Sequence, residues 1–219
     1  MSGCCHSNDC NETDPHRGDP SFKRVLWIVL AINAAMFLIE IVAGLAAGSA
    51  SLQADALDFL GDTANYAISL FVVGTALRYR SMAALVKGAT MALFGVWVMG
   101  TVVWHSVMGT VPEPLTMGVV GSAALVSNAV CFGLLYAYRS GDANMRSVWV
   151  CSRNDVLGNL AVLLAALGVF GTGAGWPDLI VATVMALLAI QGAIVVVRHA
   201  MEEFNSSRGA LPLSKPADL

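Results

Sequence analysis

Apolar residues along the chain fall into six long segments, separated by short stretches that are polar or rich in Gly and Pro. Each segment is close to the ~20 residues that an α-helix needs to cross the hydrocarbon core of a bilayer. A helix satisfies its own backbone hydrogen bonds, which lipid cannot do for it. We therefore expect an all-α, polytopic membrane protein with six transmembrane helices, at approximately 24–48, 52–77, 82–107, 115–138, 147–170 and 177–199.

Composition supports the same class. Hydrophobic residues make up 57% of the chain and charged residues 12%, with a mean hydropathy of +0.69. Soluble domains carry about 25% charged residues, so an ordinary soluble domain is excluded. The net charge of -3 gives no reason to expect a nucleic-acid partner. The expected surroundings are the lipid bilayer.

The basic residues predict the orientation. Of the 12 Lys and Arg residues, all but Arg153 lie toward one side of the expected bundle, and Arg78, Arg80 and Lys87 bracket the second joint. The Gly- and Pro-rich joints at 48–51, 109–114 and 171–177 contain none. Cytoplasmic loops carry the excess of positive charge in membrane proteins. Both termini are therefore expected in the cytoplasm, for a multi-pass protein of the cytoplasmic (inner) membrane if the cell is bacterial.

Residues 1–23 are polar and are expected to form a disordered cytoplasmic arm. Their thiols and imidazole follow a CCHxxxC pattern, a density of soft ligands that could capture a metal ion. The spacing matches no structural zinc module, so a reduced tail whose cysteines happen to be close is an equal alternative. The side chains concerned are Cys4, Cys5, His6 and Cys10.

The second apolar segment contains the run ADALDFLGDTAN, with three aspartates at i, i+3 and i+7. On an α-helix these residues, Asp55, Asp58 and Asp62, share one face. A charge at mid-bilayer costs at least ~2.5–3.5 kcal/mol, so three carboxylates require a cation, protons or water as partners. This face is the first candidate for a cation site.

The fifth segment contains an answering stripe, in which Cys151, Asp155 and Asn159 lie at i, i+4 and i+8. The alternatives are a small buried thiol at Cys151 and an interhelical hydrogen bond at Asn159. Counting ~1.5 Å per residue from each membrane face places Asp62 level with Asp155, and Asn159 level with Asp58.

Four polar side chains, two of which lie in the stripes described above, are assigned to a second tier of metal or proton ligands. An isolated Glu inside a membrane helix usually faces the bundle interior, where it can pass protons or hydrogen-bond a neighbour. In the fourth segment Asn128 and Cys131 are expected to serve packing, and Gly44 to form a helix-packing notch. The second-tier residues are Glu40, Asp55, Asn65 and Asn159.

The run GSASLQADALDFLGDTANYAISL, the run CSRNDVLGN, the opening Trp176-Pro177-Asp178 and six spans together resemble the cation diffusion facilitator family of divalent-metal/proton antiporters. In that family the second and fifth helices each supply a pair of ligands one turn apart. The resemblance implies that the metal ligands are Asp58, Asp62, Cys151 and Asp155.

Two departures from the family pattern change this picture. Cys151 stands where the family has histidine, which makes the expected site softer. The chain also stops about twenty residues after the last span, where many members carry a cytoplasmic domain, so a short form without that domain is expected. The resulting divisions are an arm at 1–23, a six-helix cation-efflux domain at 24–199 and a short cytoplasmic tail at 200–219.

The expected function is export of a divalent transition-metal cation, of the zinc, cobalt or cadmium class, in exchange for protons. No resident cofactor is expected, and the family resemblance implies a homodimer. The alternative is a membrane metal sensor or accessory protein that binds ions without moving them, with the arm as its receptor. An enzyme is not expected, because the chain has neither an HExxH pair nor a GxSxG elbow.

Overall fold

The computed structural model of the chain describes residues 20–71, 77–136 and 142–209. The cluster of Cys4, Cys5, His6 and Cys10 lies outside these ranges. Within the helices, the described side chains exclude those at 22, 69, 77–78, 80, 142–154 and 203–209. Cys151 is therefore placed on its helix by its backbone alone.

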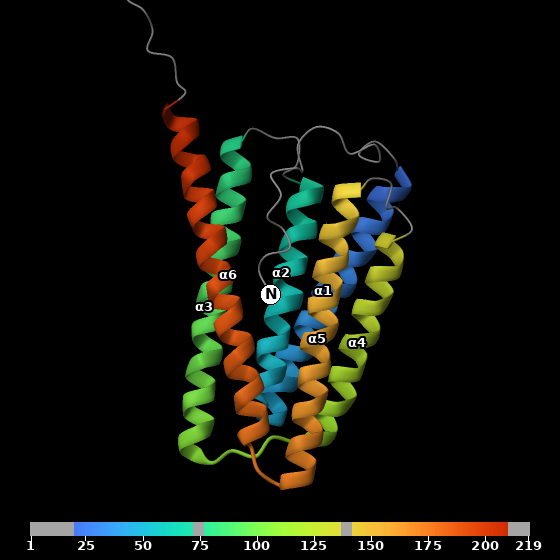
Figure 1. Ribbon diagram of the computed structural model, residues 1–219, viewed down its shortest axis with the longest axis vertical. Helices are drawn as coiled ribbons and strands as arrows, with labels where there is room; N and C mark the ends of the chain where they lie inside the picture. Colours follow the sequence, from blue (N-terminus) through green and yellow to red (C-terminus); the bar gives the residue numbers. More distant parts are fainter. Residues whose placement is uncertain (1–19, 72–76, 137–141, 210–219) are drawn as a thin grey trace, which may run out of the picture.

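The described residues form helices and no strands, as the hydrophobic pattern predicts. Five helices in these ranges are long and apolar enough to cross a membrane, judged by length and composition. The remaining helix, α2, carries the three aspartates. It lies alongside the other five helices (Figure 1). The expected all-α, polytopic membrane fold is confirmed. Its elements are α1 (Pro20–Ala47), α2 (Ala50–Phe71), α3 (Leu77–Met108), α4 (Pro114–Tyr136), α5 (Asp142–Thr172) and α6 (Trp176–Gly209).

Several helices extend beyond the apolar segments that predicted them, among them α3 and α6. α3 begins at Leu77 rather than near residue 82, and α6 continues to Gly209 rather than ending near residue 199. Hydropathy marks where a helix meets lipid, whereas the helix itself ends where its backbone hydrogen bonds are interrupted. The added turns of α3 and α6 mix polar and charged residues with apolar ones and contain no proline. The helices therefore continue beyond the apolar segments.

The three joints without basic residues are tight turns that each begin with a glycine in the left-handed region. Gly48, Gly109 and Gly173 have φ angles of 66°, 67° and 64°. After α1, the Ser49 amide returns to the Gly44 carbonyl at 2.9 Å, which is the bond of a glycine-terminated helix end. Each turn reverses the chain within a few residues, so successive helices run antiparallel.

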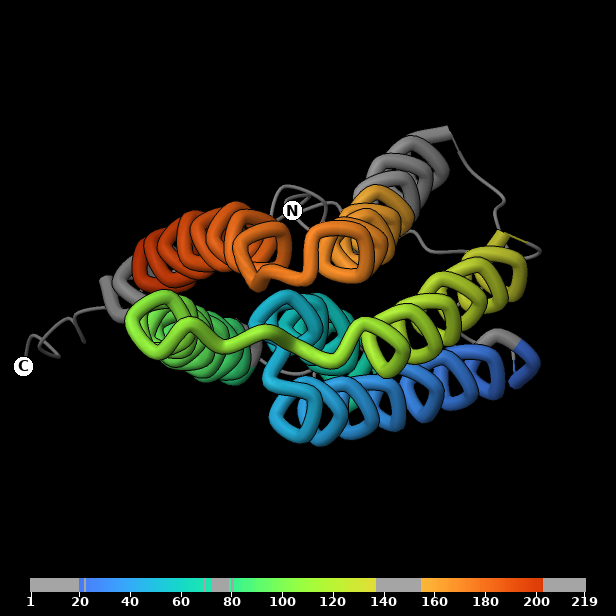
Figure 2. The backbone as a smooth tube through the Cα atoms, turned by 90° about the horizontal axis from the view of Figure 1, so that it is seen from below, coloured from blue at the N-terminus to red at the C-terminus, as the bar shows by residue number. Residues whose placement is uncertain are grey.

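α2 lies at the centre of the bundle. It packs against α1, α3, α5 and α6, and viewed along the bundle it is enclosed by the other helices (Figure 2). The helices lie close together at the end with the three glycine turns and diverge toward the other end (Figure 1). The aspartates are thus carried by the helix with the least access to lipid.

Gly44 allows α1 and α2 to approach closely. A Cβ atom placed on Gly44 would lie 2.9 Å from Cγ and 3.1 Å from the backbone nitrogen of Gln53. Any side chain at this position would therefore push the two helices apart. The packing notch predicted at Gly44 is confirmed.

The start of α2 is held by an aspartate from α6. Asp178 accepts hydrogen bonds from the Ser49 hydroxyl at 2.7 Å and from the backbone N–H groups of Ala50 and Ser51 at 2.8 and 3.0 Å. The first N–H groups of a helix have no partner within the helix, and they favour a negative charge. Asp178, Ser49 and Ser51 are fully buried. Asp178 therefore caps a helix other than its own.

Burial changes along α2 from the capped end. Residues 49–57 are all buried, whereas residues 62–68 are all half-buried. This gradient matches the divergence of the helices toward the end at which α1 begins (Figure 1). Asp55 lies in the closed part of α2, and Asp62 lies in the more open part.

We predict that Asp178→Ala lowers the free energy of unfolding by about 3 kcal/mol or more, because buried donors left unpaired cost ~1–3 kcal/mol each. Denaturant unfolding of the detergent-solubilised protein measures this. The control is Glu113→Ala: Glu113 accepts from the N–H groups of Leu115 and Thr116 at the start of α4 but is exposed. Water can accept these hydrogen bonds in place of Glu113. Equal losses of stability in the two variants would therefore contradict the stabilising role of Asp178 at the start of α2.

Candidate metal centre

The aspartates of α2 lie on the side of the helix that faces α1, α4 and α5. Asp55 contacts Asn159 of α5, Asp58 lies against Asp155 of α5, and Asp62 is in electrostatic range of Cys131 on α4. These neighbours come from segments far apart in the sequence. The structure therefore surrounds the aspartate face with polar groups.

Asp55 belongs to a hydrogen-bond network that links three helices. With the Asn159 amide oriented so that its nitrogen faces the carboxylate, this nitrogen donates to the two oxygens of Asp55 at 2.8 and 3.2 Å, and the amide oxygen accepts from Nδ2 of Asn128 at 2.9 Å. Asp55 and Asn159 are buried to 1% and 0% exposure. Asn159 thus forms interhelical hydrogen bonds, one of the two roles considered from its sequence. Asn128, expected to serve packing, completes the network.

Glu40 of α1 lies beside this network. It is fully buried, and neither of its carboxylate oxygens has a hydrogen-bond donor among the described residues. Its nearest acidic neighbour is Asp55, and Asp58 lies within electrostatic range. Two carboxyl groups can hydrogen-bond each other only if one carries a proton. Glu40 and Asp55 are therefore placed to share one.

Asp58 and Asp155 bring α2 and α5 together at the next level. Their side chains are close enough to hydrogen-bond each other. Sequence counting had placed Asp155 level with Asp62 and Asn159 level with Asp58, and both predictions are wrong by about one helical turn. The count took each helix to be straight, perpendicular to the membrane and to start at the end of an apolar segment. α5 in fact begins at Asp142, five residues earlier than the segment that predicted it.

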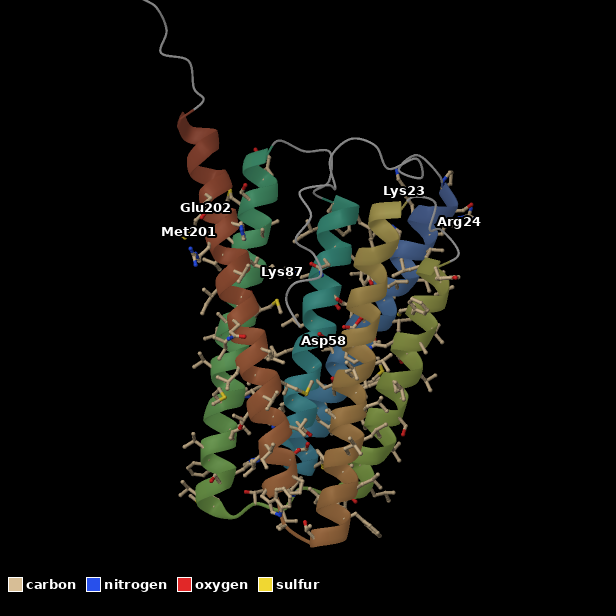
Figure 3. The ribbon with its side chains drawn as sticks, viewed as in Figure 1. Lys23, Arg24, Asp58, Lys87, Met201 and Glu202 are labelled. Carbon is tan, nitrogen blue, oxygen red and sulfur yellow. The ribbon has the colours of Figure 1, made fainter. Side chains whose placement is uncertain are left out.

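Asn65 contacts a cation supplied by α3. Nζ of Lys87 donates to the Asn65 side-chain oxygen, and Lys87 is half-buried. Lys87 lies on the same side of Asp58 as the beginning of α1 (Figure 3). Lys87 lies in the first half of α3 and contacts α2 through Asn65. An oxygen that accepts from an ammonium is a poor ligand for a second cation, so Asn65 is less suited to the second tier than Glu40 or Asp55.

Cys131, which the sequence assigned to packing, lies near the acidic residues. It is 5% exposed, and the carboxylates of Asp62 and Asp155 both act on it electrostatically. An isolated cysteine in an apolar run gives no periodic signal that separates a ligand from a packing residue. Only the fold shows that it faces the acidic region.

The ligands are not assembled into a closed metal cage. Among the described side chains, no three of His, Cys, Asp and Glu lie in an arrangement that would hold a metal ion. The side chain of Cys151 is outside that set. Its helix position, one turn before Asp155, places it further toward the end at which α5 begins.

The sequence of this helical bundle matches a known protein family. The cation efflux transmembrane domain matches residues 26–207, which is most of the chain. The chain belongs to this family of multi-pass membrane proteins, and the resemblance drawn from its motifs is confirmed.

Three relatives illustrate the range of similarity. The zinc transporter ZitB of Escherichia coli is 25% identical over 210 residues, covering 88% of this chain and 66% of the relative. The metal cation efflux system protein CzcD of Cupriavidus metallidurans is 25% identical over 211 residues, covering 91% and 64%. A cadmium, cobalt and zinc/H(+)-K(+) antiporter of Bacillus subtilis is 22% identical over 198 residues, covering 82% and 62%. The matched part is thus less than two thirds of each relative.

We predict that Asn128→Ala and Asn159→Ala each destabilise the protein by ~1–3 kcal/mol, because each leaves a buried polar partner unpaired. The double variant is expected to lose less unfolding free energy than the two single variants added together, by ~0.5–3 kcal/mol, because both substitutions disrupt the same hydrogen-bond network. A double-mutant cycle of unfolding free energies measures this coupling. Ser122→Ala, on the exposed face of α4, is the control. Additive losses would show that the two amides act independently.

Proposed function

We propose that the protein exports a divalent transition-metal cation, of the zinc, cobalt or cadmium class, from the cytoplasm in exchange for protons. The observation that carries the proposal is the meeting of Asp58 and Asp155, from two helices, inside a membrane bundle. The names of the relatives, which include a zinc transporter and a cadmium, cobalt and zinc antiporter, support the same class of substrate.

The proposed ligands are Asp58, Asp62 and Asp155, with Cys151 as the fourth by family resemblance. Three carboxylates and a thiolate give the mixed oxygen and sulfur set that suits zinc, cobalt or cadmium. Among the described side chains, no three of these ligands are grouped closely enough to hold a metal ion, so we expect the ligand side chains to move closer together when an ion binds. This ion is the substrate of the protein rather than a resident cofactor.

Electrostatics couples this ion to protons. Glu40, Asp55, Asp58 and Asp155 are too close in a low-dielectric interior for all four to be ionised, so the empty site holds protons. A dication needs deprotonated ligands and expels them. Glu40, with no donor of its own, is the group in this set with the least to stabilise its charge. We assign the Glu40 and Asp55 pair to proton exchange.

The direction of access follows from the packing. The bundle is closed around α2 at the end capped by Asp178 and more open at the end where Lys23 and Arg24 lie (Figure 3). The basic residues mark this end as cytoplasmic, so the conformation corresponds to a state that loads metal from the cytoplasm. A homodimer, expected from the family resemblance, stays a prediction.

Substitution of the proposed ligands tests transport. In proteoliposomes, Asp62→Asn and Asp155→Asn are expected to reduce metal-dependent proton movement to the level of protein-free vesicles, because each removes a charged ligand without changing side-chain volume. Glu113→Gln, which alters an exposed carboxylate outside the bundle, is expected to transport normally. Full transport by both ligand variants would overturn the site, and binding without any flux in the wild type would favour a sensor.

Glu40→Gln tests the proton site separately. This variant is expected to bind metal but to release fewer protons per bound ion, because the amide cannot give up a proton in the same way. For the same reason, metal affinity should rise less steeply with pH than in the wild type. A pH-indicator titration in weakly buffered detergent solution measures both. An unchanged proton count would remove Glu40 from the exchange.

A further inference from the structure

A thiol on α4 lies next to the proposed ion site. Cys131 is 5% exposed and forms a buried cluster with Val25 and Val29 of α1, against which Tyr66 of α2 packs. Tyr66 is one helical turn from Asp62. The thiol therefore faces the space between α1, α2 and α4, on the more open side of the aspartates.

The charged groups that face this thiol are the proposed metal ligands. Asp62 of α2 and Asp155 of α5 are the carboxylates that act on Cys131 electrostatically. α1 contributes an uncharged amide, because Nδ2 of Asn33 contacts the sulfur at 3.6 Å. A soft donor thus lies in the electrostatic field of two carboxylates.

The same amide offers an unused oxygen. Asn33 is 1% exposed, and its Nδ2 also donates to the Val29 carbonyl at 2.8 Å, which fixes the orientation of the amide. Its Oδ1 has no hydrogen-bond donor among the described residues. A buried acceptor left without a donor costs ~1–3 kcal/mol. A cation at this position would provide Oδ1 with a partner. An apolar packing role for Cys131 does not explain why a buried oxygen without a donor lies beside it.

We propose that Cys131 and Asn33 form a binding station for a thiophilic dication, such as cadmium, between α1 and α4. The station rests on the proposed function, since it would lie on the path of the ion between the cytoplasm and Asp62. On binding, the Cys131 sulfur releases its proton to the solvent and forms a bond to the ion, while Oδ1 of Asn33 supplies a neutral oxygen. Cys131 is then a second thiol, besides Cys151, that favours soft ions.

Cadmium–thiolate absorption in the ultraviolet tests this directly on the full chain in detergent. In a background with Cys4, Cys5 and Cys10 changed to Ser, two thiols remain, Cys131 and Cys151. Cys131→Ser in this background is expected to reduce the absorption by about half, because one of two thiolate ligands is lost. Unchanged absorption and unchanged cadmium affinity would overturn the proposal.

A second variant guards against a disturbed fold. Cys131→Val keeps the apolar contacts with α1, so it should remain as stable as the background while losing the same absorption. Conversely, a chain that keeps Cys131 as its single thiol should retain a cadmium–thiolate band, and Asn33→Leu in that chain should weaken cadmium binding. A single-thiol chain without the band would also overturn the proposal.

These measurements are made at equilibrium without a membrane gradient. A protein that binds cadmium at Cys131 but moves no ion would contradict the proposed function and leave the station in place. A protein that transports zinc normally but lacks the Cys131 absorption signal would overturn the station and leave the proposed function in place.

Discussion

The structure depends on how each buried carboxyl group is compensated in an interior that lacks water. Asp178 receives three hydrogen bonds from the start of α2, and Asp55 receives two from Asn159. Glu40 receives none from the described residues. Asp58 faces another carboxyl group, that of Asp155. Donors around a buried acid stabilise its charge, whereas an acid without donors must take up a proton or a cation.

This difference divides the bundle along α2. At one end, Asp178, Ser49 and the Gly44 contact fix α2 to α6 and α1, and every residue from 49 to 57 is buried. Beyond Asp58 the helices diverge and α2 becomes half-buried. A fixed end and a looser end are what a bundle needs if it is to admit an ion from one side while it remains closed to the other. The groups that lack donors lie where these two regions meet.

The sequence was sufficient for the class of fold and for the face of α2. Long apolar segments predict membrane helices because backbone satisfaction in lipid leaves few alternatives. The spacing of Asp55, Asp58 and Asp62 predicts a common face because helical geometry is regular. Gly44 could be predicted because its neighbours are local in the sequence.

The sequence was insufficient wherever a contact depends on the relative depth of two helices. The pairing of Asp155 with Asp58 differed from the count by about one turn, because tilt and helix ends are set by tertiary packing. The sequence shows Asp178 only as part of the opening of the sixth apolar segment, and only the fold brings it to α2. Asn128, Asn33 and Cys131 are single polar residues in apolar runs, so no periodicity distinguishes their roles.

The central claim is that α2 and α5 together hold a dication among their carboxyl groups. Crystals of the full chain grown with cadmium would test it through the anomalous difference density. A peak is expected between α2 and α5, beside Asp58, Asp62 and Asp155. Bound cadmium confined to other parts of the protein, with no peak between these helices, would contradict it.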